Sequence, residues 1–181
     1  MNDDWALLES ARQGKQSAWN ELVSAHRKRL LKMLCILLGS SDSAEDIVQE
    51  TFLRLFQNRN EFYRGNFYAF LSKIAYNLAL KSLSHRIPQV EIGDMEIADS
   101  ASSAMDCLIR EEKNLLLWEV VSSLEAEFRE VISLRFYAGH SYIEIAEILN
   151  LPLGTVKSRI FYAVQKCRQR LHSKGYKNEP Y

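Results

Sequence analysis

The chain has 181 residues, 47% of them hydrophobic, and its formal net charge at neutral pH is zero. The apolar content supports a real core for one domain or two small ones, and the neutral balance argues against a surface uniformly covered by nucleic acid. Gly and Pro are few, and no stretch shows the regular alternation and turn spacing of a β-sandwich or barrel, so we expect an all-α fold.

The charges are nevertheless segregated along the chain. Residues 155–178 hold seven Lys or Arg and no acidic residue, whereas residues 89–112 hold seven acidic residues against one Arg. The first of these segments could meet an anion such as DNA.

The cysteines and the N-terminus indicate a cytoplasmic protein. Cys35, Cys107 and Cys167 are far apart and have no metal-ligand spacing, so we expect free thiols in a reducing compartment, with no metal and no cofactor. The start of the chain lacks a signal pattern, and the longest apolar run, residues 33–38, is too short to cross a bilayer. We expect no membrane insertion.

Four helices are predicted in the N-terminal part. The first starts after Asn2-Asp3-Asp4 and stops at Gly14, and the second, capped by Ser17, carries apolar residues at helical spacing over 18–38. The third covers residues 43–57 and the fourth covers 67–86. We expect residues 1–87 to form one small helical domain.

Residues 88–105 change character. They are acidic, small and turn-forming with weak periodicity, which predicts a flexible acidic linker. Helical periodicity resumes over residues 107–121 and again over about 125–137. A second small helical domain is therefore expected over residues 106–181.

The stretch from Ser141 to Leu171 predicts a helix-turn-helix. Its first helix has an apolar face made by Ile143, Ile145, Ala146, Ile148 and Leu149. A break at residues 150–154 follows, and Thr155 opens a second helix with Val156 and Ile160 inward. If this second helix enters a major groove, its start would face base edges and phosphates through Leu153, Thr155, Lys157, Ser158 and Phe161 or Tyr162, with Arg159 on the backbone. A helical hairpin with a solvated basic face is the less favoured interpretation, because turn chemistry and one-sided charge coincide here.

Two further surfaces stand out. The run Tyr63-Arg64-Gly65-Asn66 followed by Phe67-Tyr68-Ala69-Phe70 is what a single-strand binder would show, although Phe67 and Phe70 are expected to be buried. Residues Asp46, Gln49, Glu50, Leu53 and Arg54 share a second face on the third helix. Without a nearby His or a third ligand, the carboxylates predict a solvated or partner-facing helix surface and no catalytic or metal site.

Both halves resemble one family. SDSAEDIVQETFLRLF and GNFYAFLSKIAYNLAL are similar to region 2 of an extracytoplasmic-function (ECF) sigma factor of bacterial RNA polymerase, and SYIEIAEILNLPLGTVKSRI is similar to its region 4. The resemblance implies a transcription initiation factor, not an enzyme, that binds core RNA polymerase and promoter DNA and is usually controlled by an anti-sigma factor. It differs from the family pattern at Phe70, at Lys81 to Arg86, at Glu125 and at residues 161–164, which bears on promoter sequence.

The resemblance also implies residue roles. Contacts with the clamp coiled coil of the polymerase fall to Asp46, Gln49, Glu50, Phe52, Leu53 and Arg54. Contacts with the −10 element, including a flipped base, fall to Tyr63, Arg64, Asn66, Phe67, Tyr68, Lys73, Asn77 and Lys81. The helix that starts near Leu153 would read the −35 element, and its domain would also sit on the polymerase flap.

Two alternatives remain open from the sequence. One is a self-sufficient transcription regulator that uses the same helix-turn-helix and binds DNA without polymerase. The other is a helical adaptor that binds only proteins, for which charge reversal at Lys157 and Arg159 would leave activity untouched.

Overall fold

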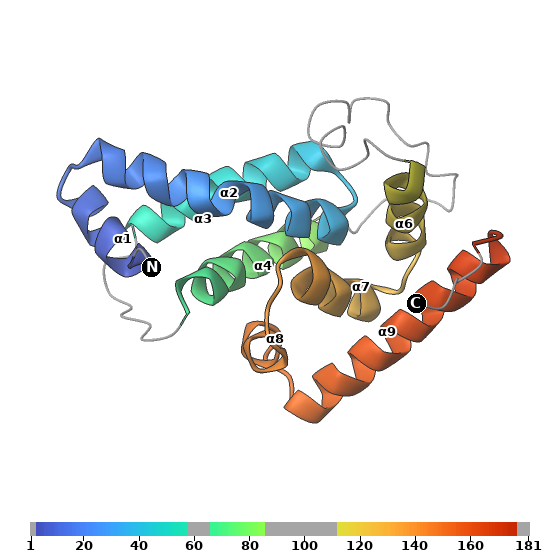
Figure 1. Ribbon diagram of the computed structural model, residues 1–181. Helices are drawn as coiled ribbons and strands as arrows, with labels where there is room; N and C mark the ends of the chain where they lie inside the picture. The colour runs from blue at the N-terminus through green and yellow to red at the C-terminus, as the bar shows by residue number, and fades with distance from the viewer. Residues whose placement is uncertain (1–2, 58–65, 86–111, 177–181) are drawn as a thin grey trace.

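The computed structural model describes residues 3–57, 66–85 and 112–176, and within these ranges the chain is helical with no strand (Figure 1). This confirms the all-α prediction. The helices are α1 (Asp4–Arg12), α2 (Gln16–Leu38), α3 (Ser41–Gln57), α4 (Phe67–His85), α6 (Glu112–Ser122), α7 (Ala126–Ile132), the π-helical turn η1 (Ser133–Tyr137), α8 (Tyr142–Leu149) and α9 (Leu153–Ser173). The predicted linker, residues 88–105, lies outside the described residues, and so do Tyr63 and Arg64.

Local signals set the ends of the first helices. The Asp3 carboxylate accepts a hydrogen bond from the Trp5 backbone N–H at 3.1 Å and caps α1, as predicted. The prediction that Ser17 caps the second helix is wrong, because α2 already begins at Gln16 and Lys15 occupies the cap without a side-chain hydrogen bond. Gly39, with φ of 68°, ends α2 in the left-handed region that glycine tolerates.

The N-terminal half is a bundle in which α2 packs against α1, α3 and α4. Its centre contains fully buried side chains from three helices, Leu22 and Leu34 of α2, Leu55 of α3 and Leu71 of α4. Each buried leucine contributes about 1.5–3 kcal/mol relative to an exposed one, so this layer supplies much of the stability. Phe67 and Phe70 are buried here, which confirms that prediction.

The C-terminal half contains α6, α7, η1, α8 and α9, and α9 packs along α7 and α6. The helix predicted over residues 125–137 is present as α7, which widens into η1, where the Ala138 N–H reaches back to the Ser133 carbonyl at 2.9 Å. Val156 and Ile160 of α9 are buried, as predicted.

Two details of the predicted helix-turn-helix are wrong. Ile143 was expected on the apolar face, yet it is 62% exposed. At about 100° per residue, Ile143 lies roughly 200° around the helix from Ile145, and Ile145 and Ile148 take the buried side of this short helix. The second helix also starts at Leu153, two residues before Thr155, because Pro152 holds an extended backbone at the cap position.

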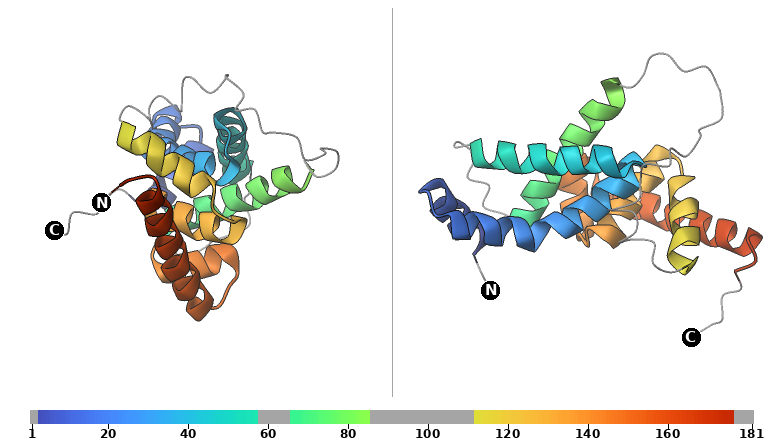
Figure 2. Two further views of the ribbon diagram at one scale, coloured as in Figure 1. Left: turned by 90° about the vertical axis from the view of Figure 1, so that its right-hand side faces the viewer. Right: turned by 90° about the horizontal axis from the view of Figure 1, so that it is seen from above.

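The two halves are packed against each other. Helix α2 contacts α6, α7 and η1, and α4 contacts α8; Figure 2 shows the helices of the two halves from two further sides. The buried side chains form one cluster that runs through both halves. Throughout the described ranges, no helix is both long enough and apolar enough to cross a membrane. We call this contact region, where α2 meets α6, α7 and η1 and where α4 meets α8, the seam.

Candidate nucleic-acid interface

Helices α8 and α9 form a helix-turn-helix whose turn is fixed by local chemistry. The Ser141 hydroxyl accepts from the Glu144 N–H at 3.3 Å and the Glu144 carboxylate accepts from the Ser141 N–H at 2.8 Å, a complete capping box for α8. At the other end, Asn150 adopts φ of 53° and closes the helix in the left-handed conformation. These two ends position the start of α9.

The start of α9 presents a mixed apolar and basic surface. Phe161 and Tyr162 are 64% and 52% exposed and form a T-shaped pair with ring centroids 5.4 Å apart. Leu153, Lys157 and Ser158 are also exposed, whereas Thr155 is only partly so. This is the face predicted to enter a major groove, and the structure leaves it uncovered.

Some basic side chains of α9 form ion pairs with carboxylates near α7, and within the described ranges Lys157 does not. Arg159 lies 3.0 Å from Glu127 and Lys166 lies 2.5 Å from Glu125, both on the side that faces α7. The hydrogen bond from Lys166 is the main reason why the pKa of the Glu125 carboxyl is lowered. Among the described residues, Lys157 has no ion-pair partner within 4 Å, so its charge is available to a ligand.

Helix α3 presents the face predicted to bind a protein. Asp46, Gln49 and Leu53 are exposed, and Glu50 accepts from Arg54 at 2.7 Å along the helix. Phe52 differs from the others, because it is only 5% exposed and packs edge-on against Trp19 with centroids 5.9 Å apart. Its role in this structure is to fix α3 to α2.

Sequence reasoning missed part of this α3 face. Phe56, one turn beyond Leu53, is exposed and packs against Trp19, and it extends the apolar part of the surface. The i+3 spacing from Leu53 was a signal that could have found it.

The predicted single-strand surface at the start of α4 meets the C-terminal half. Asn66 accepts from the Tyr68 N–H at 2.9 Å through Oδ1 and donates through Nδ2 to Glu144 at 2.6 Å. Tyr68 is 4% exposed and stacks on His140, with centroids 5.0 Å apart and planes at 21°. Further along α4, Lys73 is partly exposed, and Asn77 and Lys81 are exposed.

Four further residues take part in this contact, and sequence reasoning did not single them out as site residues. Arg29 lies over the Tyr68 ring at 4.2 Å, His26 stacks on the same ring at 5.4 Å, and the His140 ring shares a 2.8 Å hydrogen bond with Ser72. These residues come from α2, α4 and the turn before α8, so no spacing in the sequence could have brought them together.

Burial controls the ionisation of this cluster. It lowers the pKa of His140 from 6.5, with Arg29 acting in the same direction and Glu144 opposing, and it raises the pKa of Tyr68 to about 12. Burial would raise the pKa of Glu144, but hydrogen bonds from the Ser141 N–H and hydroxyl lower it overall. At neutral pH the cluster therefore holds a neutral imidazole and a carboxylate.

No group of three or more His, Cys, Asp or Glu side chains in residues 3–57, 66–85 and 112–176 is arranged to hold a metal ion. Cys35 and Cys167 are free thiols, and Cys107 lies outside the described residues.

Comparison with known proteins matches both halves of the chain. The model of Sigma-70 region 2 matches residues 22–86, and that of Sigma-70, region 4 matches residues 120–169. The ECF RNA polymerase sigma-E factor of Haemophilus influenzae is 32% identical, over 93% of this chain and 95% of its own length. The chain belongs to the ECF sigma factors.

Other similar proteins agree with this family. The ECF RNA polymerase sigma factor SigW of Bacillus subtilis is 29% identical over 91% of this chain and 94% of its own. The fold is similar to that of CnrH in complex with the cytosolic domain of CnrY, with a TM-score of 0.70 and 24% identity over 95% of this chain and 99% of that one. It is also similar to the sigma factor RpoE in complex with the anti-sigma factor NepR from Bartonella quintana, at a TM-score of 0.64 and 23% identity over 84% and 96%.

Membership places this sigma factor among transcription initiation factors and not among enzymes. The region 2 match covers α3 and α4, and the region 4 match covers α7, α8 and α9 up to residue 169. The predicted surfaces thus lie in the matched regions, one exposed on α3, one exposed on α9, and one at the start of α4 that the seam covers.

Proposed function

We propose that this ECF sigma factor binds core RNA polymerase and directs it to promoters whose −35 and −10 elements it recognises. The observation that carries the proposal is the uncovered start of α9 within the region 4 match, where Lys157 and Ser158 stand beside exposed aromatic side chains. A helix start of this kind can contact base edges and phosphates together in a major groove.

Region 2 would supply the other contacts. The exposed face of α3, with Asp46, Gln49 and Leu53, is the surface we assign to the clamp coiled coil of the polymerase. The start of α4 is assigned to the −10 element, where Asn66 and Tyr68 would hold an unpaired base. Unstacking a base costs a few kcal/mol, and contacts available only in the open strand would offset that cost and aid melting.

The proposal includes further partners and a place of action. Region 4 would also sit on the polymerase flap, and the protein would work in the cytoplasm with the polymerase. The solved relative RpoE is bound to an anti-sigma factor, which supports an anti-sigma partner for this chain as well.

In-vitro transcription with purified core polymerase on a promoter library tests the function. We expect transcripts that depend on this protein. We expect Lys157→Glu to lower them by about fivefold to a hundredfold, because a lost contact of about 1–3 kcal/mol corresponds to roughly that range. Lys15→Glu, the same charge reversal at an exposed position before α2, is the matched control and should leave transcription unchanged. Absence of any protein-dependent transcript, where a known sigma factor works, would contradict the proposal.

A further inference from the structure

The seam is held by polar and aromatic contacts that involve the residues we assign to the −10 element. The Asn66 amide donates to Glu144 at 2.6 Å, and the Tyr68 ring stacks on His140. The His140 ring also shares a 2.8 Å hydrogen bond with the Ser72 hydroxyl, and both side chains are buried. These contacts join α4 and the residue before it to α8 and the segment that leads into α8.

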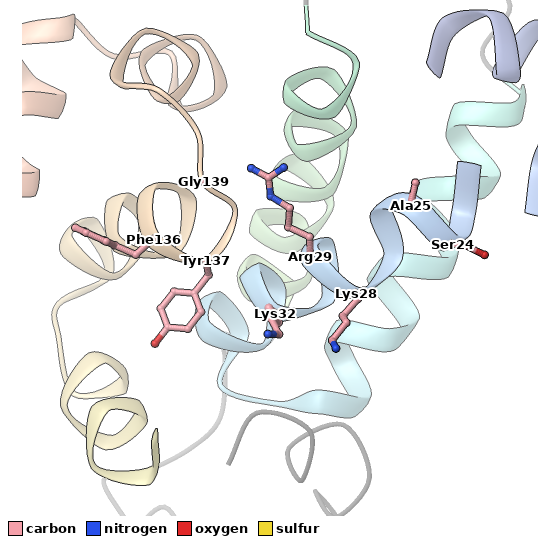
Figure 3. Close-up of a pocket in the computed structure, with 8 residues that line it drawn as sticks. All are labelled: Ser24, Ala25, Lys28, Arg29, Lys32, Phe136, Tyr137 and Gly139. Carbon is pink, nitrogen blue, oxygen red and sulfur yellow. The ribbon is translucent and has the colours of Figure 1, made fainter. Parts of the chain in front are cut away.

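The turn before α8 is shaped to make this approach. Gly139 has φ of 67°, and a Cβ at this position would lie 2.6 Å from Nη2 of Arg29. Figure 3 shows the Arg29 side chain extending from α2 toward Gly139. The same guanidinium lies over the Tyr68 ring. The chain reversal at Gly139 therefore places His140 against the surface that Arg29 of α2 and Tyr68 of α4 form together.

We propose that these contacts form an intramolecular latch, in which His140 holds the C-terminal half on the N-terminal half and keeps Asn66 and Tyr68 from single-stranded DNA until the imidazole is protonated. The DNA part rests on the proposed function. The closure of the seam and its dependence on His140 do not rest on that function.

The sign of the pH dependence follows from burial. His140 is 1% exposed when the latch is closed, and burial lowers its pKa from 6.5. An opened latch would return the ring to water and to its ordinary pKa, so the open form binds a proton more readily. The closed form is therefore favoured above pH 6.5, and its population decreases as the pH falls below 6.5. One pH unit below 6.5 the balance shifts toward the open form by about tenfold, as long as the closed ring stays neutral.

Other charged groups face His140 from each neighbouring element. Arg29 of α2 disfavours the protonated ring, and Glu144 of α8, 3.8 Å from its Nδ1, favours it. Arg135 of η1 donates to the His140 backbone carbonyl, while α4 contributes the neutral Ser72 and Tyr68. His26 lies behind Tyr68 and pairs with Asp4 within the N-terminal half, so its own titration does not separate the halves.

Solvent reaches the edge of the latch. A hollow of about 530 Å³ lies between α2 and η1 and is lined by the cations Lys28, Arg29 and Lys32 on one side and by Phe136, Tyr137 and Gly139 on the other (Figure 3). Gly139, which directly precedes His140, therefore lies at the edge of this hollow. Protonation of the His140 ring would also set its charge against that of Arg29, and this repulsion favours opening.

Small-angle X-ray scattering between pH 8 and pH 5.5 tests the latch in the full chain. We expect the radius of gyration of the wild type to rise below pH 6.5. The double variant His140→Phe with Ser72→Ala retains a ring against Tyr68 and removes both the titrating group and its hydrogen-bond partner, so it should stay compact across the range. His172→Phe, at an exposed histidine of α9, is the matched control and should behave as the wild type.

Two results would overturn the latch. One is a wild-type radius of gyration that does not change with pH, and the other is a double variant that expands with the wild type. Should the double variant fail to fold by circular dichroism, ¹H–¹⁵N NMR of the histidine rings in the wild type decides. A His140 ring that titrates at an ordinary pKa while the protein remains compact would also contradict the proposal.

A second arm separates the latch from the proposed function. Binding of a labelled single-stranded −10 oligonucleotide library, followed by anisotropy, should strengthen by up to about tenfold at pH 5.5 in the wild type and not in the double variant. If scattering shows opening but DNA binding does not follow, the latch stands and the assignment of Asn66 and Tyr68 to the −10 element is wrong. The comparison of wild type with Lys157→Glu in transcription tests the proposed function separately, because Lys157 of α9 belongs neither to the latch nor to the start of α4.

Discussion

Asn150 shows how one residue fixes the geometry of the DNA-reading surface. Its φ of 53° lies in the left-handed region, where asparagine and glycine are tolerated and a β-carbon without a polar side chain is strained. The same residue ends α8, and the Leu151 N–H then reaches the Ala146 carbonyl at 3.0 Å. The direction in which α9 leaves the turn depends on this backbone conformation.

Substitution at Asn150 should therefore follow backbone conformation and not side-chain size. We expect Asn150→Ala to lower the free energy of unfolding by about 1 kcal/mol and Asn150→Gly to leave it nearly unchanged. Asn77→Ala, at an exposed position inside α4, is the control and should not destabilise, because alanine favours helix. Chemical denaturation of the three variants gives the comparison, and an alanine at 150 as stable as glycine would contradict the conformational explanation.

At the scale of elements, one side of α3 packs against neighbouring helices and the other side is exposed. Val48, Phe52 and Leu55 are buried against the neighbouring helices, while Asp46 and Gln49 point outward. The helix keeps its structure through the buried side, so changes on the outer side should affect a partner without affecting the fold.

The double variant Asp46→Ala with Glu50→Ala tests this division. We expect weaker binding of core RNA polymerase, by about tenfold, with an unchanged circular dichroism spectrum, because the helix loses charges on its exposed face and no buried contact. Asp42→Ala, exposed in the first turn of the same helix, is the matched control. Equal affinities of the double variant and the wild type would remove α3 as the polymerase-binding surface.

Much of the helix pattern was readable from the sequence because it rests on local signals. The apolar spacing of α2 to α4, the Asp3 cap and the break after Leu149 all act within a few residues, and the structure has them, although the break ends at Pro152 and not at residue 154. The face of Ile143 could not be read, since α8 is too short for periodicity to choose among its isoleucines. The contact of His140 with Ser72 depends on packing between residues 68 positions apart, which local patterns do not specify.

At the scale of the whole molecule, the seam contains two titratable groups, the buried His140 and the partly buried Glu130, whose protonation has opposite effects on the packing of the halves. Besides His140, Glu130 of α7 faces Tyr76 of α4 across the seam, and burial raises the pKa of this carboxyl, with Tyr76 and Arg159 opposing. Burial and the nearby Glu130 in turn raise the pKa of Tyr76. The ionised form of Glu130 thus weakens the packed arrangement, and protonation strengthens it as the pH falls.

Glu130→Gln should consequently stabilise the protein at pH 7.5 and do so less at low pH. The amide removes the cost of a partly buried charge at pH 7.5. Wild-type Glu130 removes the same cost by taking up a proton as the pH falls, so the difference in the free energy of unfolding between the two proteins narrows. Thermal unfolding at pH 7.5 and near pH 4.5 measures this, with about 2–4 °C of Tm for each kcal/mol gained in a chain of this size. Glu127→Gln, at an exposed carboxylate paired with Arg159, is the control and should give no gain at pH 7.5. A Glu130→Gln gain that persists unchanged at pH 4.5 would show that the effect does not arise from ionisation, and the seam would then respond to pH through His140 alone.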